Sequence, residues 1–350
     1  MAQTTFSLRQ VAPNDGEALR ALAEDSPDTG NIQVAPHYHV DAYTASSAMY
    51  QDSVGVVAEA DCADRLAGAG FISFGRCQYE GAIQDYAALK GLVVHPTYRR
   101  QGLATKLASW RVAWAREGIG EEGVVVATIQ DKNEGSFAVA RTWSHQLAGE
   151  LRSGVARMRK SPPNPIPGLS VRKITAGDLD AVARNMNTFY QDYNFYEPHT
   201  EASLASWLQE TPLDSAFRHY YVAVDTEGNQ LAGLGLVEQH RLVEMRVDQM
   251  PGAIRLLNKL VKLVPADGRL RQLSVVKFWF APNQVEAARS LWETLRWEWR
   301  ERANTLTYVL DSRSPLKGVF KAPFWMPQAR FTLAVNGPVP MSKERLIYPV

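Results

Sequence analysis

The chain has 350 residues, of which 45% are hydrophobic and 21% are charged, and its formal net charge is +1. This length accommodates two domains with separate cores, and the composition excludes a disordered chain. The near-zero charge gives no electrostatic reason to expect a nucleic-acid or membrane partner, and two cysteines, Cys62 and Cys77, are too few for a disulfide framework.

The first part of the chain reads as strands and helices in a mixed order. Hydrophobic periodicity predicts strands near residues 6–11, 54–60, 65–79, 85–94 and 123–129, with a short strand pair ending near 159. It predicts helices near residues 15–24, 41–50, 102–117 and 134–145. Antiparallel strands followed by strand–helix–strand–helix predict an α/β fold with a mixed, α+β-like sheet.

A proline-rich segment, SPPNPIPG at residues 161–168, has the composition of a stiff linker. The sequences on its two sides begin alike, because Ser7, Arg9 and Asp15 recur at the same spacing as Ser170, Arg172 and Asp178. Further on, LAGAGFISF (66–74) matches LAGLGLVEQ (231–239). We therefore expect two long copies of one fold, residues 1–160 and 169–350.

The second copy repeats the order of the first. Its expected strands include YYVAV (220–224), LRQLSVVKFWF (270–280) and TLTYVL (305–310). The tail PFWMPQARFTLAVNGPVP (323–340) is expected to add a strand that closes the second domain. A group of large apolar side chains is expected in the core of this copy: Trp292, Leu295, Trp297 and Trp299.

The stretch VVHPTYRRQGLATKLASW, residues 93–110, combines a strand end, a basic turn and a helix start. Gly102 lets a ligand approach the backbone, and unpaired N–H groups at a helix N-terminus favour an anion. Arg99 and Arg100 add guanidinium donors suited to phosphate oxygens. The helix beyond the turn carries a core-facing stripe at Leu103, Leu107, Trp110 and Trp114.

The pattern Arg99-x-x-Gly102-x-Ala104 after LVVHP resembles motif A of the GCN5-related N-acetyltransferases, the GNAT family. The resemblance implies two tandem GNAT-like domains, the first of which binds the pyrophosphate of acetyl-CoA at this turn. It also implies that the preceding strand bonds the pantetheine arm. The implied cofactor-binding residues are Leu92, Val93, Val94, Arg99, Arg100, Gln101, Gly102, Leu103, Ala104, Thr105 and Asn133.

The family's general acid is a tyrosine seven residues after an asparagine. Asn133 stands where the family has its asparagine, but position 140 holds Ala140. The leaving thiolate of CoA therefore lacks its usual proton donor. Another group or water protonates the sulfur, or this copy transfers slowly or not at all.

The general base is also unsettled, because the position at which several family members carry Glu is Ala88. Asp85 and Tyr86 are the catalytic candidates on the same strand, and they point to opposite faces. Tyr86 shares its face with Ala88, which favours it slightly over Asp85, although packing on a neighbouring strand explains a tyrosine here better than catalysis does.

The second copy lacks the features that would hold a pyrophosphate. Ten residues separate Pro282 from Trp292, against fourteen between Pro96 and Trp110, and APNQVEAARSLW has neither a glycine nor paired arginines. FYQDYNFYEPH (189–199) either binds an amine or packs against the first domain; its candidate contacts are Tyr190, Asp192, Tyr193, Tyr196 and Glu197.

No metal site is expected, because His37 and His39 lack a third ligand nearby. The first residues lack the apolar core of a signal peptide and no run reaches transmembrane length, so we expect a cytoplasmic protein. A homodimer is compatible with the sequence.

The resemblance implies an acyltransferase that passes an acetyl group from acetyl-CoA, or another acyl-CoA, directly to an amine. A backbone amide near Val94 would stabilise the tetrahedral oxyanion. The acceptor would be a small-molecule amine or a peptide, with no nucleic acid and no membrane as partner. The alternative is a non-catalytic acyl-CoA-binding or interaction protein built from two GNAT folds.

Overall fold

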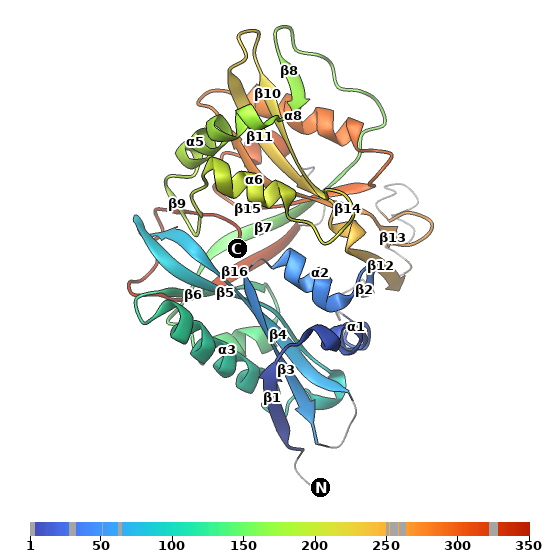
Figure 1. Ribbon diagram of the computed structural model, residues 1–350, viewed down its shortest axis with the longest axis vertical. Helices are drawn as coiled ribbons and strands as arrows, with labels where there is room; N and C mark the ends of the chain where they lie inside the picture. Colours follow the sequence, from blue (N-terminus) through green and yellow to red (C-terminus); the bar gives the residue numbers. More distant parts are fainter. Residues whose placement is uncertain are drawn as a thin grey trace.

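The computed structural model describes residues 4–27, 33–50, 52–61, 65–249, 252, 258, 264–321 and 328–350. Its largest sheet runs through both halves of the chain in the order β1-β3-β4-β5-β6-β16-β7-β15-β14-β11-β10-β8 (Figure 1). The predicted mixed α/β class is confirmed. Within the described residues, no helix is both long and apolar enough to cross a lipid bilayer.

The first half of the chain builds one end of this sheet. Its strands are β1 (Phe6–Gln10), β3 (Ser53–Ala60), β4 (Leu66–Tyr79), β5 (Ala82–Val94) and β6 (Val124–Gln130), and its helices are α1 (Gly16–Glu24), α2 (Ala42–Met49), α3 (Leu103–Ile119) and α4 (Glu134–Ala140). Successive residues of a strand point to opposite faces of the sheet, and helices cover both faces. Val57 packs under α1 and α2, whereas Val56 and Ala58 pack under α3. The short α4 ends five residues before its predicted end.

The second half repeats the same order of elements. Its strands are β8 (Ser170–Lys173), β10 (Arg218–Val224), β11 (Gln230–Val237), β14 (Gln272–Phe280) and β15 (Thr305–Asp311), and its helices are α5 (Leu179–Phe189), α6 (Glu201–Gln209), α8 (Val285–Glu298) and α9 (Lys317–Phe320). Val222 packs under α5 and α6, and Ala223 packs under α8. Two mixed sheet halves with helices on both faces thus follow the predicted repeat.

The repeated sequence at the start of each copy forms the same ion pair twice. Arg9 donates to both carboxylate oxygens of Asp15 at 2.7 Å, and Arg172 donates to both oxygens of Asp178 at 2.8 and 2.7 Å. The two-pronged bonds from arginine hold the pKa of each carboxyl below its usual range. Each carboxylate also accepts a backbone N–H three residues earlier, which fixes the turn that leads into α1 or α5.

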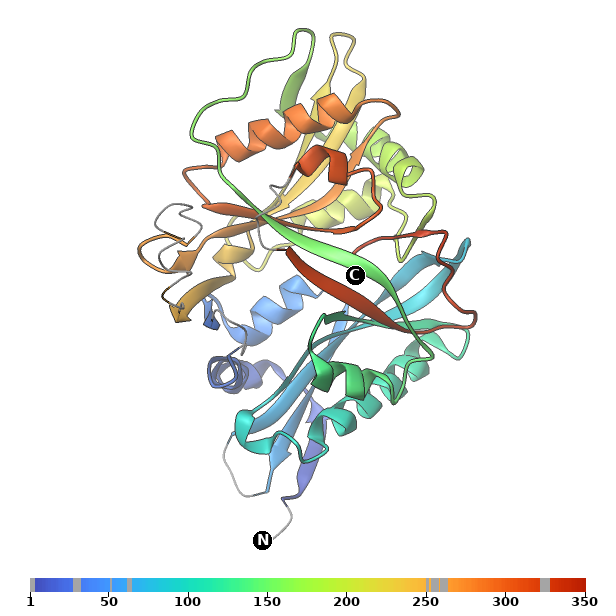
Figure 2. The same ribbon diagram turned by 180° about the vertical axis from the view of Figure 1, so that it is seen from behind.

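The last long strand of each half pairs with strands of the other half. β16 (Gln328–Asn336) pairs antiparallel with β6 and β7, and β7 (Gln146–Arg157) pairs antiparallel with β15 (Figure 2). The tail was expected to close the second domain, and this expectation is wrong. The short strand pair predicted up to residue 159 is likewise one long strand. An alternating pattern specifies a strand but not its neighbour, so the exchange is invisible in the sequence.

Of the two smaller sheets, one also joins the halves and the other lies within the second half. β2 (Gln33–Tyr38) of the first half pairs with β12 (Val243–Gln249), which pairs with β13 (Arg269–Leu270). β9 (Tyr193–Asn194) pairs in parallel with β17 (Leu346–Ile347) near the end of the chain. The segment 189–199 packs against the first half, since Phe195 donates its N–H to the Gln78 carbonyl at 2.7 Å. Packing is therefore the alternative that the structure supports: Phe195 joins a core cluster with residues of the first half, and the tyrosines are buried in the core of the second half.

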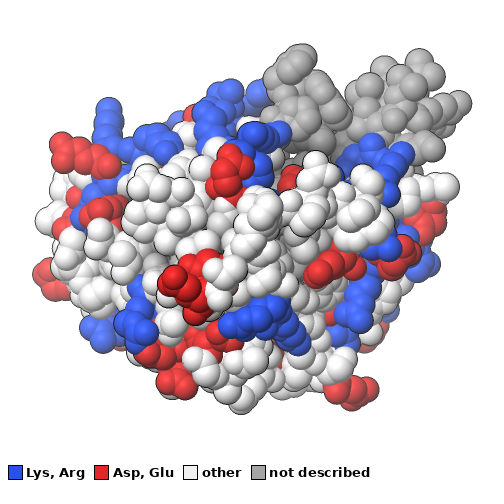
Figure 3. Space-filling view, turned by 90° about the horizontal axis from the view of Figure 1, so that it is seen from above, with Lys and Arg blue, Asp and Glu red and all other residues white. Residues whose placement is uncertain are grey.

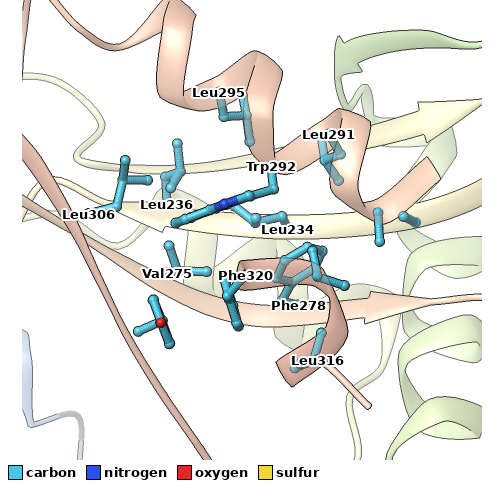
Figure 4. Close-up of a cluster of buried hydrophobic side chains, with 14 of the residues drawn as sticks. Leu234, Leu236, Val275, Phe278, Leu291, Trp292, Leu295, Leu306, Leu316 and Phe320 are labelled. Carbon is cyan, nitrogen blue, oxygen red and sulfur yellow. The ribbon is translucent and has the colours of Figure 1, made fainter. Parts of the chain in front are cut away.

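The core of the second half lies between its sheet and α8 (Figure 4). Trp292 is fully buried there, with Leu291 and Leu295 of the same helix beside it. Phe320 of α9 contacts the Trp292 ring edge-on at 5.0 Å. The predicted core role of Trp292, Leu295 and Trp299 is confirmed, and Trp297 is half-buried beneath Arg300.

Candidate functional site

The centre of the first half contains two strands that diverge. β5 and β6 pair in parallel only from Tyr86–Val124 to Ala88–Val126, beyond which no pairing joins them. Gly91 has φ +58° at the point where the register between β4 and β5 shifts, which turns the end of β5 away. The backbone of β5 from Leu89 onward is therefore free to bond a ligand on the side of β6.

Two neighbouring cavities occupy the space between the diverging strands. The larger has a volume of about 470 Å³ and the other about 380 Å³, and both are lined by Leu92, Asn133, Ser136 and Val139. The first extends past Ala88 and Ala140 toward Phe331 of β16 and Val350. The second extends past Val94 to Arg99 and Ala104 at the start of α3. Together they form a path from the basic turn to the border between the halves.

The turn before α3 has the geometry that an anion site needs. Gly102 has φ +78° and precedes the first residue of the helix, and its side-chain position is open, with no atom within 4 Å. The helix has no side-chain cap, so the N–H groups of its first turn point to the open surface. Arg99 donates its Nε to the Val94 carbonyl at 3.1 Å, which ties the turn to the end of β5.

The cofactor-binding residues implied by the family divide into three groups. Leu92, Val93, Val94, Arg99, Ala104 and Asn133 line the cavities. Leu103 is 1% exposed and packs in the core, so its side chain cannot touch a ligand there. The remaining residues are exposed on the turn or the first turn of α3: Arg100, Gln101, Gly102 and Thr105.

Asn133 and Ala140 lie at the two ends of α4. The Asn133 side chain accepts the N–H of Ser136 at 3.1 Å and so caps the helix. Ala140 lines the larger cavity and is 2% exposed, packed against Ile129 and Ala334. At the position where the family's tyrosine would reach the sulfur, this chain has a methyl group.

The two catalytic candidates lie outside this cavity. Asp85 is exposed and pairs with Arg76 at 3.4 Å on the outer surface. Tyr86 is half-buried and packs against Gly75, and burial raises the pKa of its phenol well above the usual range. Tyr86 consequently keeps its proton at neutral pH and cannot serve as a base.

The larger cavity is also lined by residues that escaped prediction, among them Arg111, Lys90 and Tyr50. Arg111 is 3% exposed on α3, and its Nη1 donates to the carbonyls of Phe71 and Lys90 at 3.4 and 3.2 Å, where the β4–β5 register shifts. Burial lowers its pKa to about 10. Lys90 lies 5.6 Å from the Tyr50 ring, and both residues line the cavity. The sequence did contain a signal for Arg111, because it is a charged residue four positions after Leu107, on the predicted apolar stripe.

The stripe itself differs from the prediction. Leu103 and Leu107 are buried, whereas Trp110 and Trp114 are only half-buried and stack on each other at 4.8 Å. The two histidines considered for a metal, His37 and His39, lie with their rings 5.2 Å apart, and His39 contacts Glu244 at 3.4 Å. Among the residues that the structure describes, no group of three potential ligands could hold a metal ion.

The equivalent space in the second half is filled by the chain itself. β14 and β15 also pair only briefly, from Gln272–Thr305 to Ser274–Thr307. Beyond that point Phe320 of α9 stacks on Tyr308 at 3.9 Å and meets Phe278 edge-on at 5.6 Å. Figure 4 shows Phe320 and Phe278 together in this space. Aromatic rings thus occupy the place that the first half keeps open.

The comparisons with known proteins agree with this arrangement. Residues 18–142 match the family model described as "Acetyltransferase (GNAT) family". None of the curated proteins matches the chain. Among solved structures, N-myristoyltransferase of Saccharomyces cerevisiae with bound myristoyl-CoA is similar with a TM-score of 0.63 at 11% identity, over 99% of this chain and 85% of that chain.

Two further structures are GCN5-related N-acetyltransferases. The protein from Sphaerobacter thermophilus is similar with a TM-score of 0.59 at 14% identity, over 96% of this chain and 97% of that chain. The protein from Kribbella flavida is similar with a TM-score of 0.52 at 13% identity, over 95% and 71% of the two chains. These likenesses show the fold over both halves. The family match is therefore confined to residues 18–142, and over the rest of the chain the likeness is one of fold alone.

Proposed function

We propose that this protein is an acetyl-CoA-dependent N-acetyltransferase whose first domain, residues 1–160, binds the cofactor. The proposal rests on the path of cavities between the diverging strands β5 and β6, which leads from the basic turn to the border between the halves. Residues 161–168 are the linker, and residues 169–350 are a second GNAT-like domain without a pyrophosphate loop. The aromatic filling around Phe320 supports this division of roles.

The cofactor would lie along this path with its phosphates at the turn. The N–H groups at the start of α3, with Arg99 and Arg100, would bind the pyrophosphate. The free edge of β5 at Leu92, Val93 and Val94 would bond the pantetheine arm, and the thioester would reach the larger cavity. The remaining contacts implied by the family come from Gln101, Gly102, Ala104, Thr105 and Asn133. Leu103 would contribute its backbone alone.

The reaction is a direct transfer. The neutral amine attacks the thioester carbonyl carbon, a C–N bond forms, and a β5 amide near Val94 stabilises the oxyanion. The C–S bond then breaks, the amine loses its proton, and CoA leaves as a thiolate that takes up a proton. Of the two catalytic candidates, Tyr86 can serve only as a proton donor, because its phenol stays protonated. Asp85, paired with Arg76 outside the cavity, has the weaker support.

A non-catalytic acyl-CoA-binding protein is the second candidate. The small side chains at Ala88 and Ala140, where the family has its base and acid, favour it. The two candidates make different predictions for turnover, because both require acyl-CoA binding but only the enzyme releases free thiol.

The decisive experiment measures acetyl-CoA binding by calorimetry and thiol release with a panel of amines. Gly102→Glu puts a carboxylate where the phosphates would bind, so we expect binding to fall at least tenfold and thiol release to fall with it. Gly120→Glu is the matched control: it lies at the other end of α3, has φ +70°, and is equally open. Binding without turnover on any amine would favour the second candidate, and unchanged binding in Gly102→Glu would contradict both.

The acceptor, in this proposal, is a small-molecule amine or a peptide amine, and the reaction takes place in the cytoplasm. A buried free thiol at Cys77 supports a reducing compartment. Basic and acidic side chains are interspersed on the face in Figure 3, which favours neither nucleic acid nor a membrane as partner. Fractionation of cells and size-exclusion chromatography test the location and the proposed homodimer.

A further inference from the structure

A separate cavity of about 210 Å³ lies between α2 of the first half and the sheet of the second half. It has an unusual lining: two residues are cationic, and none of the described residues that line it is acidic. Its lining residues are Ala48, Met49, Trp207, Phe217, Arg218, Val237, Gln239, Ser274, Val276, Lys277 and Tyr348. We propose that this cavity binds an anionic group of the acceptor, a carboxylate, through the ammonium of Lys277. The inference rests on the proposed function, because it names the class of amine that the enzyme acylates.

The cavity is adjacent to the one that would hold the thioester. Met49 lines the 210 Å³ cavity, and the next residue, Tyr50, lines the larger one. At the end of the chain, Tyr348 lines the former and Val350 the latter. Two residues of extended chain span at most about 7 Å. A small molecule with its carboxylate beside Lys277 can therefore present an amine to the larger cavity.

Lys277 is held in an uncommon backbone conformation. Its φ is +51°, a region that costs a non-glycine residue about 1 kcal/mol or more. The Tyr220 hydroxyl donates to the Lys277 carbonyl at 2.8 Å, and the Tyr190 hydroxyl donates to the next carbonyl, that of Phe278. Lys277 lies in a bulge where the register between β11 and β14 shifts. The buried network fixes this bulge and so directs the lysine side chain toward the border between the halves.

The ammonium of Lys277 has only neutral partners at close range. Its Nζ lies 2.5 Å from Nε2 of His199 and 5.4 Å from the centre of the Trp207 ring. Burial and the neighbouring lysine lower the pKa of His199 to about 3, so this imidazole is neutral. Among the described residues, no carboxylate lies within ion-pair distance of Lys277; Glu197 acts on it only at longer range.

The neighbouring polar groups leave room for an anion. Arg218 donates to the carbonyls of Trp207 and Ala48 at 3.0 and 2.9 Å, so it pins α2 to the second half. Its charge is paired with Glu210 at 3.6 Å, which leaves Lys277 as the cation available to an anion. The Gln239 oxygen accepts the Ser274 hydroxyl at 2.6 Å, which orients its amide N–H groups away from that hydroxyl. A carboxylate would meet an ammonium and an amide donor in a pocket with aromatic walls.

The energetics favour occupation by an anion. A buried ammonium without a counter-ion is destabilised, and burial lowers the pKa of Lys277 to about 7. A bound carboxylate supplies the missing charge, so binding should draw a proton onto the amine near and above neutral pH. Arg218, Glu197, His199 and Tyr348 are the other titratable groups around it. Of these, the imidazole of His199 and the phenol of Tyr348 are neutral, so neither competes with Lys277 for the anion.

The test uses probes without a free amine, so that it is independent of turnover. Binding of N-acetylglycine, N-acetylalanine and N-acetylphenylalanine, each beside its carboxamide, is measured by calorimetry with the full chain, with and without CoA. We expect each acid to bind at least tenfold more tightly than its amide. We also expect proton uptake, seen as a heat that depends on the ionisation enthalpy of the buffer.

Lys277→Met should abolish the preference for the acid, whereas Lys173→Met, on the exposed side of β8, should retain it. Lys277→Met removes a buried charge and should fold, and a thermal melt checks this. The proposal would be overturned by equal binding of acids and amides or by no binding of either. An unchanged preference for the acid in Lys277→Met would also overturn it. So would acylation of Lys277 itself by acetyl-CoA, detected by peptide mass spectrometry. Loss of acetyl-CoA binding or turnover with the acid preference intact would count against the proposed function alone.

Discussion

Gly91 and Lys277 occupy the same place in the two halves of the molecule, and both have a left-handed backbone, with φ of +58° and +51°. Each lies three residues beyond the last residue of its strand that pairs with the next strand. In the first half the missing side chain leaves a cavity, which Gly91 lines. In the second half the same bulge carries an amine into the border between the halves. One backbone feature thus serves two different chemical purposes.

The first prediction concerns Gly91→Ala. A Cβ at this position would lie 3.3 Å from the Phe71 ring and 3.7 Å from the Tyr50 hydroxyl, on a backbone that favours glycine. We expect a loss of about 1 kcal/mol in unfolding free energy and weaker acyl-CoA binding, because the cavity narrows. Gly81→Ala, in the β4–β5 turn at φ +87°, should show the same loss of stability with normal binding. Denaturant unfolding and calorimetry measure the two effects, and normal binding in Gly91→Ala would contradict the placement of the ligand.

The second prediction concerns Arg111, whose guanidinium lies under the register shift of β4 and β5. Arg111→Met removes the donors to two buried carbonyls, and each unsatisfied group costs about 1–3 kcal/mol. We expect a lower thermal midpoint and weaker acyl-CoA binding, since the end of β5 loses its support. Arg111→Lys should recover part of both, because an ammonium reaches one carbonyl. A variant with normal stability would show that water replaces the guanidinium at no net cost.

Much of the fold followed from local signals in the sequence. The two Arg–Asp pairs that mark the repeat form the same bidentate contact in both halves, and the turn before α3 has the open glycine that its sequence required. These features depend on residues a few positions apart, and local spacing determines them. For the segment 189–199 the sequence left amine binding and packing open, and the burial of its tyrosines favours packing.

The remainder depends on contacts between residues far apart in the chain. β16 lies between β6 and β7 by pairing Val335 with Val126, and no local pattern encodes a partner about two hundred residues away. For the same reason the sequence could not place Phe331 and Val350 at the cavity. Lys277 was hidden within an apolar strand, where only its charge, between Val276 and Phe278, distinguished it.

The third prediction concerns the exchanged strands. Leu333 of β16 is fully buried between β6 and β7 and belongs to a core cluster that includes Val126 of the first half and Phe195 of the second. Leu333→Ala should cost about 2–5 kcal/mol. Because the strand completes the sheet of both halves, we expect the two halves to unfold together, in one transition shifted to lower temperature. Val309→Ala is the control: Val309 of β15 is 39% exposed, so its truncation should shift the transition little. Two separate transitions in Leu333→Ala would contradict a shared sheet.

The fourth prediction is the pH dependence of stability caused by Lys277. In the unfolded chain this amine has a pKa near 10.5, and burial lowers the pKa to about 7 in the folded protein. Below pH 7 both states are protonated, so the folded state bears the full penalty of the buried ammonium. Between pH 7 and 10.5 the folded state releases the proton that the unfolded state keeps, and the penalty falls as the pH rises.

Lys277→Met removes this penalty at every pH. Its thermal midpoint should therefore exceed that of the wild type by several degrees below pH 7, and the difference should shrink steadily toward pH 10. Lys173→Met, whose side chain is exposed, should give no such trend. The saturating acid probe N-acetylglycine should raise the midpoint of the wild type and leave that of Lys277→Met unchanged, because the bound carboxylate supplies the counter-ion. A midpoint difference that does not change with pH would mean that the amine is solvated in the folded protein, and the cavity would then lack the unpaired charge on which anion binding depends.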